Sequence, residues 1–141
     1  MNDKQLQLVT FNQAVALKKH GFNLETYEYY DPDDMFQYND EGRALNFGKS
    51  RFNHNKKRID PRFCKFISAP SIPLALKWFR DTKGLNAFCD NKYHGWHYDI
   101  YSIGNDAIRI DGNELQIFFE TYEEAESALL DELLMLIENE K

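Results

Sequence analysis

The chain has 141 residues, of which 43% are hydrophobic and 28% are charged, and these values are typical of a single globular domain. Its net charge of −6 at pH 7 argues against general nucleic-acid binding, and no apolar run reaches the roughly 18 residues of a membrane-spanning helix. Residues 1–5 lack the pattern of a signal peptide, so we expect a cytoplasmic protein without a membrane partner. In that compartment Cys64 and Cys89 are expected to be free thiols.

Residues 9–21 carry the first helical pattern. Thr10 is a typical N-cap, and Gln13 occupies the position that completes a capping box. Gly21 is a typical left-handed stop after the last turn. The buried face is expected to consist of Phe11, Ala14, Val15 and Leu17.

The next segment is rich in aromatic and β-favouring residues, and residues 25–30 are predicted to form a strand. Residues 35–38 and 44–47 flank a turn sequence that ends in Gly42, and this pattern predicts a β-hairpin. The apolar pattern lapses over residues 48–62, so we expect an exposed loop there.

A second helix is expected to begin near Ser71, its N-cap, and to end at Gly84. A meander of three strands should follow, with residues 111–113 as the turn between its last two strands. The three strands are predicted at residues 96–103, 107–110 and 114–119.

The last helix has the clearest start signal in the chain. Thr121 is its expected N-cap, and Glu124 completes a capping box. Its main apolar stripe consists of Ala125, Ala128, Leu129, Leu133, Leu136 and Ile137. Leu130 and Leu134 lie outside that stripe, so either the N-terminal third of the chain or a second subunit must cover them. They are our candidate self-association surface in a homodimer.

These elements predict an α+β fold in a single domain, residues 1–141. Residues 1–67 are expected to form a helix and β-hairpin extension. Residues 68–141 are expected to form an α-β-β-β-α core with an antiparallel sheet.

The order of elements in this core, from Ser71 onward, is similar to that of the double-stranded-RNA-binding domain. That fold binds RNA through basic residues at the start of its last helix. This chain has Glu123, Glu124 and Glu126 there. The resemblance therefore implies the topology of that domain and not its RNA contacts.

The second half of the chain also resembles a family of small uncharacterised proteins encoded by phages, prophages and mobile elements of Bacteroidetes-type bacteria. The matching stretches are Ala69-Pro70-Ser71, residues 75–80, Gly84-Leu85, residues 98–100, residues 119–125 and Ala128-Leu129. The resemblance implies a phage-type accessory role in the cytoplasm of a host cell. It implies no catalytic residue, because the matching positions are caps, stops and core residues.

Cys64, Cys89, His94 and His97 are the residues that would suggest zinc. Their spacing fits no standard zinc finger. In a regular strand His94 and His97 would also point to opposite faces, because their positions differ by an odd number. We therefore predict neither a metal site nor another cofactor.

An acidic stretch over residues 25–41 leaves a hydrolase hypothesis open. Asp31, Asp33 and Asp34 would hold its divalent ion. No lysine inside the stretch completes a nuclease-like pattern, and the chain has no nucleophile elbow or phosphate-binding glycine loop. We therefore expect no enzymatic activity and keep the hydrolase as the second alternative.

The most informative polar feature is the basic stretch of residues 49–65, in which seven Lys or Arg face one acid, Asp60. Aromatic residues interleave with the cations, as in sites that bind nucleotides or nucleic acid. The candidate ligand- or partner-binding residues are Lys49, Arg51, Phe52, His54, Lys56, Lys57, Arg58 and Arg62.

Three functional hypotheses follow from these patterns. The leading one is a non-enzymatic accessory protein that binds a host protein, in the manner of a phage counter-defence factor. The alternative is a nucleotide or nucleic-acid binder that uses residues 49–65, and salt-sensitive binding would distinguish it from the first. The metal-dependent hydrolase comes third.

Overall fold

The structure is a computed structural model that describes residues 6–32, 44–56, 65–92, 95–102, 109–112 and 118–139. The chain forms two compact units. Unit 1 consists of Met1–Gln7 and Ile72–Lys141, and unit 2 consists of Leu8–Ser71. The boundary between the units therefore falls four residues after the division predicted at residue 67.

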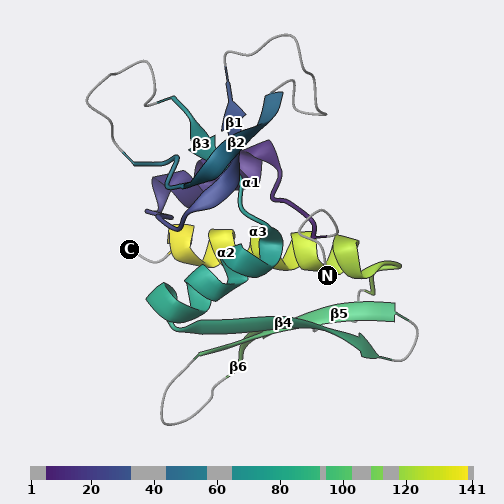
Figure 1. Ribbon diagram of the computed structural model, residues 1–141. Helices are drawn as coiled ribbons and strands as arrows, with labels where there is room; N and C mark the ends of the chain where they lie inside the picture. Colours follow the sequence, from purple (N-terminus) through teal and green to yellow (C-terminus); the bar gives the residue numbers. More distant parts are fainter. Residues whose placement is uncertain are drawn as a thin grey trace. The chain divides into compact units, whose positions relative to one another are not determined.

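The described residues contain three α-helices and two antiparallel sheets, so the predicted α+β fold is confirmed (Figure 1). Unit 2 contains α1 (Phe11–Lys19), β1 (Thr26–Asp31), β2 (Ala44–Phe52) and β3 (Ile67–Ser68). Unit 1 contains α2 (Ile72–Trp78), a π-helical turn (Phe79–Lys83), β4 (Leu85–Lys92), β5 (Gly95–Ser102), β6 (Arg109–Gly112) and α3 (Tyr122–Asn139).

Helix α1 begins at the predicted capping box. The backbone N–H of Gln13 donates to the hydroxyl of Thr10 at 3.2 Å, and the backbone N–H of Thr10 donates to the side chain of Gln13 at 2.9 Å. Gly21 has φ +95° and ends the helical segment as predicted. The prediction that Val15 is buried was wrong, since it is exposed. Gln13 takes a buried position instead because the capping box holds its side chain against the chain.

In unit 2, β1 lies between its two antiparallel neighbours in the order β2-β1-β3. β2 continues to Phe52, so the loop predicted from residue 48 begins only at residue 53. Gly48 permits this continuation, because a Cβ there would lie 3.1 Å from the carbonyl oxygen of Tyr27. The predicted hairpin partner of β2, residues 35–38, lies outside the described residues.

One face of this sheet packs on α1 through Tyr30. Its ring meets the ring of Phe11 edge to face at 5.5 Å, and its hydroxyl donates to the carbonyl of Val9 at 2.7 Å. The turn after β2 is held by Asn55, whose side-chain amide donates to the carbonyl of Phe22 at 2.9 Å and accepts from the N–H of Ser68 at 2.9 Å. These contacts fix the side chains near residue 54 against β1 and β3.

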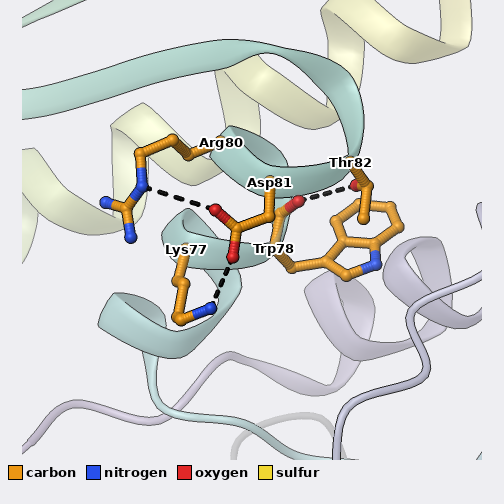
Figure 2. A network of polar contacts seen from close by, with 5 residues as sticks. All are labelled: Lys77, Trp78, Arg80, Asp81 and Thr82. Carbon is orange, nitrogen blue, oxygen red and sulfur yellow. Dashed lines mark hydrogen bonds and ion pairs between the residues drawn. The ribbon is translucent and has the colours of Figure 1, made fainter.

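In unit 1, α2 runs into the π-helical turn, which ends at Gly84 with φ +66°, the predicted stop. The hydroxyl of Thr82 donates to the carbonyl of Trp78 at 2.6 Å (Figure 2). On the exposed side, Asp81 accepts a hydrogen bond from Lys77, which lowers the pKa of that carboxyl. Solvent screens such exposed pairs, so we interpret this network as a helix surface and not as a site.

The second sheet has the order β4-β5-β6. The predicted strand at residues 96–103 is confirmed as β5, but the meander starts one strand earlier than predicted, at β4. The turn predicted at residues 111–113 was wrong for its first two members, because Asp111 and Gly112 lie in β6 and pair with β5. Sequence patterns missed β4 because half of its residues are Asn, Asp or Lys, which disfavour strands.

Helix α3 packs on β4, β5 and α2 (Figure 1). Its N-cap is the one predicted, since the N–H of Glu124 donates to the hydroxyl of Thr121 at 3.1 Å. The predicted capping box is only half formed, because the Glu124 carboxylate accepts from that hydroxyl at 3.2 Å and not from the Thr121 backbone. Leu130 and Leu134, the predicted self-association residues, are both buried, and their role in self-association stays a prediction. Among the described residues, no helix is long and apolar enough to cross a membrane.

Candidate functional site

Side chains on the other face of the unit 2 sheet form a row of aromatic rings. The side chain of Tyr29 points to the opposite face of the sheet from that of Tyr30, because successive strand residues point to opposite faces. Its ring stacks on His54 at 4.5 Å and lies 4.9 Å from Phe66. The ring of Phe52 extends the row, 5.6 Å from His54. Strand pairing therefore collects rings from three separate segments of the sequence.

His54 is the structural member of this row. It is only 6% exposed, and its Nε2–H donates to the carbonyl of Thr26 at 3.1 Å. The expectation that it forms part of an exposed loop surface is therefore corrected. The sequence suggested exposure because its neighbours are charged, whereas the strand pairing places it against β1.

Phe52, 36% exposed, is the exposed member of the row, and Tyr27, two residues before Tyr29 in β1, is 41% exposed. The guanidinium of Arg51 lies over the Tyr27 ring at 5.7 Å, a cation–π contact. Lys56 is exposed a few residues further on. We call Tyr27, Arg51, Phe52 and Lys56 the aromatic–basic surface. Tyr27 was missed from the sequence because only pairing with β2 brings it beside the basic stretch.

The remaining predicted residues of the basic stretch are placed as follows. Lys49 lies in β2, and Lys57, Arg58 and Arg62 lie outside the described residues. Lys65 lies 3.5 Å from the carboxylate of Asp31 and 5.8 Å from the ring centre of Phe66. A cation therefore lies near each end of the aromatic row.

Charge is divided unevenly between the two units. Unit 2 contains ten Lys or Arg and eight Asp or Glu, whereas unit 1 contains seven Lys or Arg and 15 Asp or Glu. The net negative charge of the chain therefore comes from unit 1. The negative net charge of the whole chain therefore does not disfavour anionic ligands of unit 2.

The strand register separates the residues that would suggest zinc. Cys89 pairs with Tyr98 and Asp90 pairs with His97, so Cys89 and His97 lie on opposite faces of the sheet. Cys64, His94, Asp33 and Asp34 lie outside the described residues. Within the part of the chain that the structure describes, no three His, Cys, Asp or Glu side chains are arranged to hold a metal ion.

Unit 1 contains a buried acid that the sequence did not reveal. Glu126 was expected at an exposed, anionic helix start, but it is 2% exposed and accepts a hydrogen bond from the hydroxyl of Tyr122 at 2.8 Å. Burial raises the pKa of the Glu126 carboxyl, and the negative charge of Glu123 adds to the effect. Burial also raises the pKa of the Tyr122 hydroxyl.

The negative charge of Glu126 acts on the thiol of Cys89. Burial, with a smaller contribution from the charge of Glu126, raises the pKa of Cys89 to about 12. The thiolate is the nucleophilic form of cysteine, so Cys89 is a poor nucleophile at neutral pH. The cluster of Cys89, Tyr122 and Glu126 is therefore better suited to packing than to covalent chemistry.

Comparison with protein-family models, with curated proteins and with solved structures finds no significant match for this chain. The resemblance to phage and mobile-element proteins therefore stays a prediction.

Proposed function

We propose that the chain is a non-enzymatic binding protein whose aromatic–basic surface binds single-stranded nucleic acid. The observation that supports this proposal is the contact of the Arg51 guanidinium with the exposed ring of Tyr27, followed in the chain by a second exposed ring, Phe52, and an exposed cation, Lys56. Proteins that bind single strands combine these two chemistries, because bases stack on rings and phosphates attract cations.

Two exposed rings on adjacent strands favour a ligand with more than one base over a mononucleotide. Arg51 lies over Tyr27 and forms one stacking position with a cation, whereas Phe52, the next residue of β2, offers its ring on the opposite face. The surface lies on a paired sheet, which keeps the rings in place before the ligand arrives. No described contact favours a particular host protein, so the counter-defence hypothesis stays a prediction of the resemblance.

The proposal is tested by fluorescence anisotropy with a labelled single-stranded oligonucleotide of about 12 nucleotides, within the usual span of such sites. We expect Phe52→Ala and Arg51→Ala each to weaken binding about tenfold, because one stacked base contributes about 1–3 kcal/mol. Lys19→Ala removes one exposed cation from α1 of the same unit and serves as the control, with an expected change below about twofold.

Salt dependence and a duplex competitor complete this test. If Arg51 and Lys56 both contact phosphates, the logarithm of the association constant should fall with the logarithm of salt with a slope of at least about 1.4 in magnitude. A duplex of the same length should compete poorly, because its bases are not available for stacking. Equal binding of duplex and single strand, or no binding of either, would contradict the proposal.

A further inference from the structure

Among the described residues, strand β4 is an edge of the unit 1 sheet. It is the outermost strand in the order β4-β5-β6, and it pairs with β5 without a register shift from Leu85↔Ser102 to Lys92↔Gly95. Natural sheets usually protect such an edge with a proline, a bulge or a central lysine. β4 has no proline, no bulge against β5, and its two charged residues, Asp90 and Lys92, stand within its last three positions.

The direction of the edge hydrogen-bonding groups follows from β5. Trp96 exchanges both of its backbone hydrogen bonds with Phe119, at 3.0 and 2.8 Å, so these groups point away from β4. In an antiparallel pair the bonded and non-bonded positions alternate. The backbone groups of Asn91, the partner of Trp96, therefore point out of the sheet edge, and so do those of Cys89 and Ala87.

Among the described residues, no hydrogen bond outside the β4–β5 ladder involves these three outward positions. The side chains of Asn86, Phe88 and Asp90 alternate with them and are exposed. They lie on the sheet face opposite α3, because α3 meets the other face through the contact of Tyr122 with Trp96. Phe88, 41% exposed, stacks on Tyr101 with ring centres 5.9 Å apart.

We propose that β4 pairs antiparallel with β4 of a second copy of the chain, around a twofold axis at Phe88. In this register the outward groups of Ala87 meet those of the partner's Cys89, and the reverse pair forms by symmetry. Phe88 has its own backbone groups directed to β5, so the two Phe88 residues form a non-bonded pair, the type with the closest side chains. The result is one continuous six-stranded sheet.

The charges of the edge support a second copy as the occupant. In the proposed register Asp90 faces the partner's Asn86, and no two like charges meet. A register shifted to place the axis at Asp90 would bring the two Asp90 carboxylates together, which is unfavourable. A twofold axis also closes the assembly, because it uses both open edges at once. The contact spans only about 26 Å of strand, so we expect a weak, concentration-dependent dimer.

Position 86 supplies a test that leaves the core of the chain intact. In the dimer, Asn86→Lys would form two opposite-charge pairs with Asp90, one with each copy. Asn86→Asp would instead create two like-charge pairs. We expect sedimentation equilibrium to show dimerisation strengthened about fivefold by Asn86→Lys and weakened about fivefold by Asn86→Asp. The double variant Asn86→Asp with Asp90→Lys should restore dimerisation, since it places opposite charges at positions 86 and 90 across the interface.

Asn12→Asp, an exposed change of the same chemistry on α1, is the matched control and should leave the dimer unchanged. Circular dichroism melting separates folding defects from dimerisation, since Asn86 is exposed. A monomer at all concentrations would overturn the proposal, and so would a dimer that responds equally to both substitutions at position 86. These outcomes do not depend on nucleic-acid binding, which uses unit 2.

Discussion

Gly95→Val is expected to destabilise unit 1 by about 3 kcal/mol, at the upper end of the range for overpacking substitutions. A Cβ at Gly95 would lie 2.9 Å from the carbonyl oxygen of Phe119 and 3.1 Å from the Cβ of Phe118. The Phe119 backbone cannot move away freely, because its bonds with Trp96 tie residues 118–119 to β5. The expected loss is therefore steric and arises from a close approach of two backbones.

Urea unfolding followed by tryptophan fluorescence measures this loss in unit 1, because both tryptophans of the chain, Trp78 and Trp96, lie in that unit. Gly84→Ala is the comparison variant. A Cβ at Gly84 would meet no atom within 4 Å, and its φ of +66° alone should cost about 1–2 kcal/mol. A smaller loss for Gly95→Val than for Gly84→Ala would contradict the close approach.

The helix ends were predictable because their signals are local. Thr10 with Gln13, and Thr121 with Glu124, satisfy backbone groups within a single turn. Gly84 ends its segment because few other residues adopt its left-handed conformation. Each of these features depends on four or fewer neighbouring residues, so no knowledge of the tertiary fold was required.

Strand β4 and the aromatic–basic surface were only partly predictable because they depend on pairing between distant segments. β4 has few β-favouring residues and is held by its register with β5. Arg51 and Phe52 were found from the charge pattern, whereas Tyr27 joins them only through the β1–β2 pairing. The same pairing buries His54, which charge patterning placed at the surface.

Glu126 was unpredictable for a related reason, and it leads to the second large effect. A glutamate in the first turn of a helix is usually a favourable, exposed charge. In this chain the helix start packs so closely that the carboxyl is buried with Tyr122 as its hydrogen-bond donor. A buried ionised acid is costly unless it is fully paired.

Glu126→Gln is expected to increase the free energy of unfolding at pH 7 by about 2 kcal/mol, because the amide oxygen still accepts from Tyr122 and no charge is buried. Since the folded pKa of Glu126 is raised, the folded state holds this proton more tightly than the unfolded state does. Its stabilising contribution is complete below the ordinary value near 4.5 and is lost as pH rises through the raised folded pKa.

Denaturant unfolding from pH 4 to pH 8 tests this sign. The native chain should lose stability across that interval relative to Glu126→Gln, and the two proteins should converge at the acidic end. Tyr122→Phe removes the hydroxyl that favours the ionised acid, so it should destabilise the native chain at pH 7 more than it destabilises the Glu126→Gln variant. A pH-independent difference between the native chain and Glu126→Gln would contradict this, because it would mean that the pKa of Glu126 is the same in the folded and the unfolded chain.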